Sequence, residues 1–163
     1  RAQLSPVTLV LWSRGTAAVP DSGLLLDWQG PADAPLSSWL TARLAAGGIA
    51  PERLELLGGA ESVEGHLALY RRMHVALDPI PYNGTTTTCE ALWMGVPVVS
   101  LSGNTAVSRG GFSQLSNLGL PDLVAHSEDE YVAIATKLAG DLTRLAAMRH
   151  TLRARVEKSV LMA

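Results

Sequence analysis

The residues best suited to chemistry in this sequence lie in one stretch, Asp78 to Glu90, which reads Asp-Pro-Ile-Pro-Tyr-Asn-Gly-Thr-Thr-Thr-Thr-Cys-Glu. A loop rich in Pro and Gly follows an apolar run, and four threonines then lead into a helical pattern. Backbone N–H groups at a helix N-terminus lack partners and the helix dipole favours negative charge there, so such a turn suits a phosphate group. The threonine hydroxyls add donors, and Glu90, one turn into the helix, is placed to accept hydrogen bonds from sugar hydroxyls. The stretch therefore predicts a binding site for a nucleotide diphosphate.

The elements around this stretch alternate between short apolar runs and helical patterns. Continuous apolar runs bounded by turn residues are typical of buried parallel strands. We expect strands at Leu24–Trp28, Leu54–Leu57, His74–Leu77, Val98–Leu101 and Leu123–Ala125. Helices are expected over residues 6–18, 36–46, 63–72, 86–94 and 106–118, with two more that begin near residues 127 and 141. This alternation predicts a single α/β domain, in which helices cover both faces of a parallel sheet.

Three loops follow predicted strands at the carboxyl edge of this sheet, where open α/β sheets bind their ligands. They cover Gly58–Ser62, Pro79–Thr87 and Ser102–Thr105, and we expect them to be neighbours in space. His66, on the first turn after the first of these loops, is then placed to reach the same ligand as Thr86. Further candidates for sugar or phosphate contact follow the fourth strand, with helix capping as the alternative for them: Gly103, Asn104, Thr105 and Arg109.

Composition narrows the classes of function. The chain has 163 residues, 47% hydrophobic and 17% charged, and its net charge of −2 gives no electrostatic reason to expect a nucleic-acid or membrane partner. No apolar run approaches the roughly 20 residues that span a bilayer. The lone cysteine, Cys89, excludes an internal disulfide and a cysteine-based zinc cluster, and it predicts a reducing, cytoplasmic setting. The sequence has no P-loop motif and no GxGxxG in its opening strand-to-helix turn, which disfavours ATP hydrolysis of the P-loop kind and a dinucleotide dehydrogenase.

Glu90 to Val99, which reads Glu-Ala-Leu-Trp-Met-Gly-Val-Pro-Val-Val, resembles the nucleotide-sugar signature of GT-B glycosyltransferases. Together with Asn83 to Cys89, it resembles the C-terminal catalytic lobe of the O-GlcNAc transferase and SPINDLY family, in particular its bacterial members. The resemblance extends over nearly the whole chain, with further matching stretches at Leu4–Pro6, Ala50–Leu54, Ser108–Arg109 and Gly119–Ala125. It implies a Rossmann-like parallel sheet flanked by helices, the C-terminal half of a GT-B fold. It also implies that residues 1–163 form a single nucleotide-sugar-binding lobe of a longer protein.

The resemblance also implies an activity. Full-length members carry tetratricopeptide repeats and a second catalytic lobe, and they transfer a sugar from a nucleotide donor to Ser or Thr of proteins, with inversion and without a metal or cofactor. We therefore expect transfer of N-acetylglucosamine from UDP-GlcNAc to an acceptor protein, with the catalytic base outside this chain or at its edge, and no activity of this lobe alone. The donor-binding residues carried over to this sequence are His66 beside the nucleotide, Thr86 and Thr87 on the diphosphate, Glu90 on the ribose, and Asn83, Gly84 and Thr85 in the same loop.

Two positions depart from the family pattern. Val63 matches a lysine that lies near the base in the animal enzymes, and Gln3 falls near a lysine that reaches the donor phosphates, so the site is short of positive charge. Thr85 stands where the animal enzymes have His, and Cys89–Glu90 is more similar to SPINDLY, whose members include users of GDP-fucose. Two alternatives therefore stay open: an O-fucosyltransferase, and a non-catalytic module that binds nucleotides or proteins.

The resemblance implies one further strand just before Arg1, in the middle of the sheet. A lobe without that strand has an unpaired edge on each side of a gap, and unpaired edges are templates for pairing with other strands. We therefore expect a rearranged strand order or completion by another copy, with self-association through the unpaired edges.

Overall fold

The computed structural model describes residues 4–27 and 34–162 of the chain. Within these residues five strands form: β1 (Leu24–Asp27), β2 (Leu54–Leu57), β3 (Ala76–Leu77), β4 (Val98–Leu101) and β5 (Val124–Ala125). Every pairing between them is parallel, as the continuous apolar runs predicted. Trp28, the predicted last residue of the first strand, lies outside the described residues.

Seven α-helices join and flank these strands in the same part of the chain: α1 (Pro6–Ala17), α2 (Ala34–Ala46), α3 (Val63–Leu69), α4 (Thr86–Trp93), α5 (Gly110–Asn117), α6 (Glu128–Gly140) and α7 (Leu142–Glu157). Ser127 caps α6 as its sequence pattern predicted, because its Oγ accepts a hydrogen bond from the Glu130 N–H. The helix expected over residues 63–72 ends as a short 3-10 helix, Tyr70–Arg72. The helix expected over residues 106–118 is interrupted at Arg109, whose φ of −121° and ψ of 4° leave the helical region.

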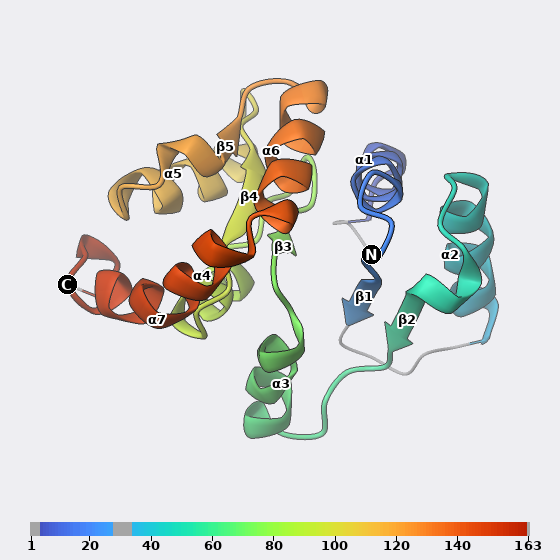
Figure 1. Ribbon diagram of the computed structural model, residues 1–163, viewed down its shortest axis with the longest axis horizontal. Coiled ribbons are helices and arrows are strands. Elements are labelled where there is room, and N and C mark those ends of the chain that lie inside the picture. Colours follow the sequence, from blue (N-terminus) through green and yellow to red (C-terminus); the bar gives the residue numbers. More distant parts are fainter. Residues whose placement is uncertain (1–3, 28–33, 163) are drawn as a thin grey trace.

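The hydrophobic core lies around β4, between helices that cover it from two sides. Val99 of β4, Leu115 of α5 and Tyr131 of α6 are fully buried there. In Figure 1, α5 and α6 lie to either side of β4, while α7 packs along α4. Helices on both faces of a parallel sheet, expected from the sequence, are therefore confirmed for this part of the molecule. Of the helices described, none is long and apolar enough to cross a membrane.

The strands form two separate sheets, β1–β2 and β3–β4–β5. The facing edges of β1 and β3 have no strand partner within residues 4–27 and 34–162, and a cavity of about 660 Å³ lies between them, lined also by α1 and α6. Figure 1 shows β1 and β3 on opposite sides of this space, with α1 above it. The expected unpaired edges are thus present, but the expected rearrangement of strand order is wrong. Since α1 packs against both α2 and α6, it holds the sheets apart and their open edges do not pair with each other. Completion by another copy and self-association stay predictions.

Candidate functional site

The loop between β3 and α4 is held at both of its ends by hydrogen bonds. The Gly84 N–H donates to Asp78 Oδ1 at 2.7 Å, which closes the loop on itself. Thr8 Oγ1, on α1, donates to the Ile80 carbonyl at 2.7 Å, and the Ser5 hydroxyl donates to the same oxygen. Because a carboxylate fixes one end and the start of α1 fixes the other, the loop presents a defined backbone to the carboxyl edge of the sheet.

Asn83, predicted to bind the donor, is buried in this loop, with 2% of its surface exposed. Its Nδ2 donates to the Pro79 carbonyl at 3.0 Å, and its backbone N–H donates to the Val107 carbonyl at 2.9 Å. The second bond joins the loop after β3 to the short 3-10 helix Ala106–Ser108, which directly follows the loop after β4. The loops after these two strands therefore lie close together, as expected. The Asn83 Oδ1 is buried and has no partner among the described residues. This geometry favours a role for Asn83 in shaping the loop.

The N-terminus of α4 opens to solvent with its hydroxyl groups. Thr85, Thr86 and Thr87 are exposed, whereas Thr88 is buried. The first backbone bond that involves this helix joins the Cys89 N–H to the Thr85 carbonyl at 3.1 Å. The N–H groups of the first helical turn therefore find no acceptor in the described part of the chain. This is the set of unpaired donors that the sequence predicted for a phosphate.

Gly84 stands where a side chain does not fit. A Cβ at this position would lie 2.6 Å from Thr87 Oγ1 and 2.7 Å from Thr88 Oγ1. Both hydroxyl oxygens lie close to Gly84, so the absence of a side chain lets the helix start directly against the loop. Donor binding by Gly84 stays a prediction.

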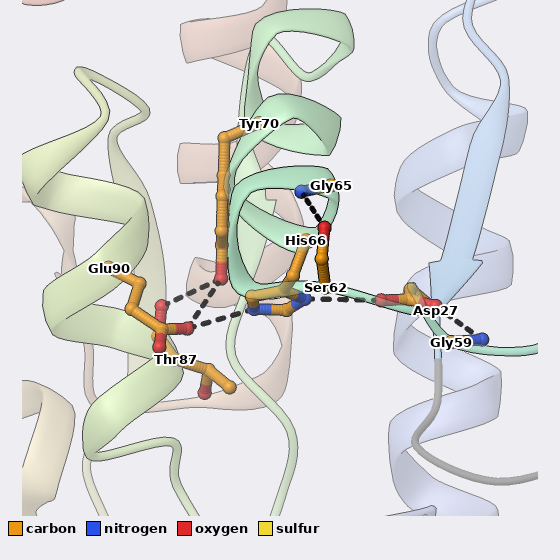
Figure 2. A network of polar contacts seen from close by, with 8 residues as sticks. All are labelled: Asp27, Gly59, Ser62, Gly65, His66, Tyr70, Thr87 and Glu90. Carbon is orange, nitrogen blue, oxygen red and sulfur yellow. Dashed lines mark hydrogen bonds and ion pairs between the residues drawn. The ribbon is translucent and has the colours of Figure 1, made fainter.

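His66, on α3, links Glu90 on α4 with Asp27 at the end of β1 (Figure 2). Its Nε2 lies 3.0 Å from Glu90 Oε2, and its Nδ1 lies 3.4 Å from Asp27 Oδ2. The Tyr70 hydroxyl lies 3.3 Å from both Glu90 Oε2 and the Thr87 carbonyl, and shares its proton between them. The structure thus places His66 against α4, the helix that begins with Thr86. That both residues reach one ligand stays a prediction.

Burial and the nearby carboxylates set the chemistry of two groups beside this network. Burial, then the charge of Glu90 and its hydrogen bond, raise the pKa of Tyr70 well above its ordinary value, so Tyr70 remains a neutral donor. Burial also raises the pKa of the Cys89 thiol, with a further contribution from Glu90. A thiol with a raised pKa is a poor nucleophile, so Cys89 does not have the character of a catalytic cysteine.

Two of the candidates after β4, Gly103 and Thr105, lie against the buried Ser108. The Thr105 N–H donates to Ser108 Oγ at 3.0 Å, and the two hydroxyl oxygens are 2.8 Å apart. Gly103 lies so close to Ser108 that a Cβ on it would be 2.3 Å from that Oγ. Capping, the alternative considered for these residues, accounts for Thr105, which forms a capping box with Ser108. Gly103 packs closely against the same serine. Asn104 and Arg109 are exposed on the rim of the edge.

Of the two positions where the resemblance implied a lysine, the structure describes only one. Val63 is the first residue of α3 and is 71% exposed, three residues before His66. Gln3 lies outside the described residues. No group of three His, Cys, Asp or Glu side chains that could hold a metal ion occurs in the ranges described. An exposed apolar side chain therefore stands at the start of the helix that carries His66, at the position where the resemblance implied a lysine.

Asp27, Tyr70 and Asp78 belong to this edge but had no assigned role in the sequence-based prediction. Asp27 and Asp78 come at the ends of β1 and β3, and a polar residue at the carboxyl end of a parallel strand is itself a signal for the ligand edge. Tyr70 lies one helical turn after His66, so it shares a helix face with that residue. These positions were readable from the sequence, but their contacts with Glu90 and Gly84 were not.

Comparisons with known proteins show which family the chain resembles. Residues 2–163 match glycosyl transferase family 41. The chain is 39% identical over 158 residues to a probable UDP-N-acetylglucosamine–peptide N-acetylglucosaminyltransferase SPINDLY of Oryza sativa subsp. japonica, a match that covers 97% of this chain and 17% of that relative. It is 34% identical over 148 residues to the UDP-N-acetylglucosamine–peptide N-acetylglucosaminyltransferase of Caenorhabditis elegans, covering 90% of this chain and 12% of that protein.

A solved structure is also similar to this chain. A mutant of the Thermobaculum terrenum O-GlcNAc transferase matches with a TM-score of 0.90 and 42% identity, over 96% of this chain and 30% of that one. The chain thus spans 17% of the length of the rice relative and 30% of the solved structure. The resemblance seen in the threonine run and the signature after it, and the α/β fold that it implied, are confirmed. The chain belongs to glycosyl transferase family 41.

Proposed function

We propose that this chain is the donor-binding part of a protein O-glycosyltransferase and that its donor is UDP-GlcNAc. The observation that carries the proposal is the exposed N-terminus of α4, where the hydroxyls of Thr85–Thr87 lie beside the Glu90–His66 pair. Donors for a phosphate and an acceptor for sugar hydroxyls then stand about one helical turn apart, which suits a nucleotide diphosphate. The names of the rice and nematode relatives, which both contain UDP-N-acetylglucosamine, support this donor.

In this proposal the chain stabilises the leaving group. As the glycosidic bond breaks, negative charge develops on the diphosphate, and the first N–H groups of α4, together with the Thr86 and Thr87 hydroxyls, donate hydrogen bonds to it. Donors that are fixed before the reaction need no reorganisation, and each is worth about 3 kcal/mol of transition-state stabilisation in an enclosed site. They take the place that a metal ion has in metal-dependent transferases.

The rest of the reaction lies beyond these residues. The acceptor hydroxyl attacks the sugar from the face opposite the diphosphate, which inverts the anomeric centre, and the base that takes its proton comes from outside this chain or from its edge. We place the reaction in a reducing compartment such as the cytoplasm, because the chain has a single cysteine.

Glu90 binds the ribose in this proposal. Its Oε2 is held by His66 and Tyr70, whereas its Oε1 has no partner in the part of the chain that is described. A ribose hydroxyl can therefore donate to Oε1 without breaking the contact with His66. This leaves His66 between the ribose and Asp27, beside the nucleotide and at the edge of the gap between the two sheets.

Two other functions are favoured by particular residues. The threonine run and Cys89–Glu90 are similar to SPINDLY, which favours GDP-fucose as the donor. Val63, exposed where the family has a lysine, favours a module that keeps the fold and has lost the transfer reaction. The base preference of the chain separates the first alternative from our proposal, and nucleotide binding itself separates the second.

Isothermal titration calorimetry of this chain with UDP, GDP and UDP-GlcNAc tests the proposal. We expect UDP to bind more tightly than GDP, and Thr86→Ala and Glu90→Ala each to raise the Kd about tenfold, the effect of roughly one lost hydrogen bond. Thr151→Ala and Glu157→Ala, which change exposed residues of α7, are matched controls and should leave the Kd unchanged. Tighter binding of GDP would favour the fucosyl donor. A folded chain that binds neither nucleotide would contradict the proposal and favour the interaction module.

A further inference from the structure

We infer that Asp78 is a positioning residue for the donor site: its buried carboxylate fixes the Gly84 turn and, through it, the phosphate-facing start of α4. The inference rests on the proposed donor-binding function, to which it adds a residue that does not touch the ligand. Asp78 directly follows β3 and is 3% exposed, so it lies beneath the ligand edge.

The Asp78 carboxylate joins three elements of the ligand edge. Its Oδ1 accepts from the Gly84 N–H at 2.7 Å, and its Oδ2 accepts from the Ser100 hydroxyl of β4 at 2.5 Å. A Cβ on Gly111, at the start of α5, would lie 2.6 Å from the same Oδ2. The N-terminus of α5 thus approaches the carboxylate closely, and its dipole favours a negative charge there.

The backbone of Asp78 is fixed to the core as well. Its N–H donates to the Val99 carbonyl at 3.0 Å, and its carbonyl accepts from the Tyr131 hydroxyl of α6 at 3.0 Å. The Trp12 Nε1–H of α1 donates in turn to that hydroxyl at 3.2 Å. The backbone of Asp78 is therefore fixed to the sheet and to α6, and through Tyr131 to α1. Its carboxylate is held in one place and can fix the Gly84 turn.

Removal of the carboxylate would act on the turn first. Gly84 is buried, so its N–H would lose its acceptor in a place that water does not readily reach. A buried donor without a partner costs about 1–3 kcal/mol. The turn can recover part of this free energy if it moves so that the Gly84 N–H reaches another acceptor or water. Thr85 and Thr86 follow Gly84 directly, so any such movement displaces the donors that face the diphosphate.

Because Asp78 can carry a charge, its positioning role should make the Kd for the donor depend on pH, which a purely structural residue would not do. Burial raises the pKa of Asp78 to about 6, against the opposing effect of the bonds from Ser100 and Gly84. The titratable group that contacts it, in the part of the chain described, is Tyr131 on α6, whose own pKa is raised by burial, so Tyr131 stays neutral. At neutral pH the ionised carboxylate lies behind the turn and repels a diphosphate, and a proton on it removes this repulsion while Oδ1 still accepts from Gly84.

Calorimetry of this chain with UDP-GlcNAc between pH 5 and pH 8 tests the inference, because the diphosphate of a nucleotide sugar does not change its charge in this range. We expect Asp78→Ala to raise the Kd about tenfold, as the loss of one buried hydrogen bond predicts. Asp78→Asn keeps an oxygen that accepts from Gly84, so it should rescue binding. The wild-type Kd should fall by about threefold from pH 8 to pH 5 relative to that of Asp78→Asn, because only the wild type loses a charge at this position.

The controls separate positioning from stability and from the proposed function. Ile49→Ala removes a buried side chain that precedes the amino end of β2, so it should destabilise the chain and leave the Kd unchanged. If the wild type binds and Asp78→Ala, folded by circular dichroism, binds as well as Ile49→Ala, the role of Asp78 is overturned while the donor site stands. If Asp78→Ala does not fold, identical pH profiles of the wild type and Asp78→Asn overturn it instead. If the folded wild type does not bind, the proposed function fails, and this inference with it.

Discussion

The two sides of the ligand edge are held in place in different ways. On the side of β3–β4–β5, the loop and helix of residues 78–90 are joined by buried hydrogen bonds, with Asp78 3% exposed. On the side of β1–β2, Asp27 reaches the same edge through a partly exposed contact of 3.4 Å with His66. The side that we propose to bind the diphosphate, called the phosphate side below, is therefore preorganised by its own loop. The side that we propose to bind the nucleoside, called the nucleoside side, depends on how two sheets are held across a gap. Changes on the first side should have larger effects than changes on the second.

The largest effect is expected at Gly84. A Cβ in Gly84→Ala would lie 2.6 Å from Thr87 Oγ1, so the turn or the start of α4 must shift. Such overpacking costs about 1–3 kcal/mol, and we expect the Kd for UDP to rise about a hundredfold because the phosphate donors move with the turn. Gly140→Ala, where nothing lies within 4 Å of the added Cβ, is the matched control and should change neither stability nor affinity by much. Wild-type affinity in Gly84→Ala would refute preorganisation by the loop.

The second effect concerns stability against pH on the same side. Burial raises the pKa of Asp78 from its ordinary 3.8 to about 6, so between these values the folded chain binds the proton more tightly than the unfolded chain. The stability contributed by this group is therefore present at low pH, falls as the pH rises through this window, and is lost above about 6. Asp78→Asn cannot ionise, so it should gain up to about 3 kcal/mol of unfolding free energy relative to wild type between pH 4 and pH 7. Urea denaturation at both pH values measures this, and a difference that does not depend on pH would contradict a buried, ionised Asp78.

A smaller effect is expected across the gap, where His66 meets Asp27. Both side chains are partly exposed, so water screens their electrostatic attraction and the contact contributes little energy. We expect Asp27→Ala to raise the Kd for UDP about threefold and His66→Ala about tenfold, with a coupling energy near 0.5 kcal/mol in the double-mutant cycle. Arg72→Ala breaks the exposed pair with Glu55, which also joins the two sides but lies away from the ligand edge, so it should leave the Kd unchanged. If the effects of Asp27→Ala and His66→Ala on the Kd are additive, the contact between the two side chains does not affect nucleotide binding.

The same contrast explains what could be predicted from the sequence. The phosphate side is built from consecutive residues, so local chemistry was enough: Gly84, the threonines and the helix start all follow from turn and helix rules. Parallel pairing also followed, because continuous apolar runs indicate strands buried on both faces. The same rules placed the strand at Leu54–Leu57 and the one at Val98–Leu101 with the bounds that the structure has.

The nucleoside side could not be predicted in this way. Asp27 meets a residue 39 positions later only because two sheets lie on opposite sides of a gap, and no local pattern encodes that distance. Asp78 belongs to the most readable stretch of the chain, yet its partner Ser100 comes from the next strand, so its role needed the register of β3 against β4. The prediction of a rearranged strand order was wrong for a related reason. The strand order depends on the packing of α1 between α2 and α6, which brings together segments far apart in the sequence.

The smallest effect is expected from adding charge to the exposed rim of the nucleoside side. Val63 is 71% exposed at the start of α3, so Val63→Lys can place an ammonium group near the proposed nucleotide without strain. A single exposed charge contributes up to about 1 kcal/mol, so we expect the Kd for UDP to fall two- to fivefold at low salt, with the gain lost at high salt. Leu142→Lys, at a residue that is also 71% exposed but lies at the start of α7, adds the same charge far from the edge and should leave the Kd unchanged. Equal gains in both variants would mean that net charge alone attracts the nucleotide, whereas a gain in Val63→Lys alone would locate the nucleotide beside α3 and show that this side of the edge contributes to binding.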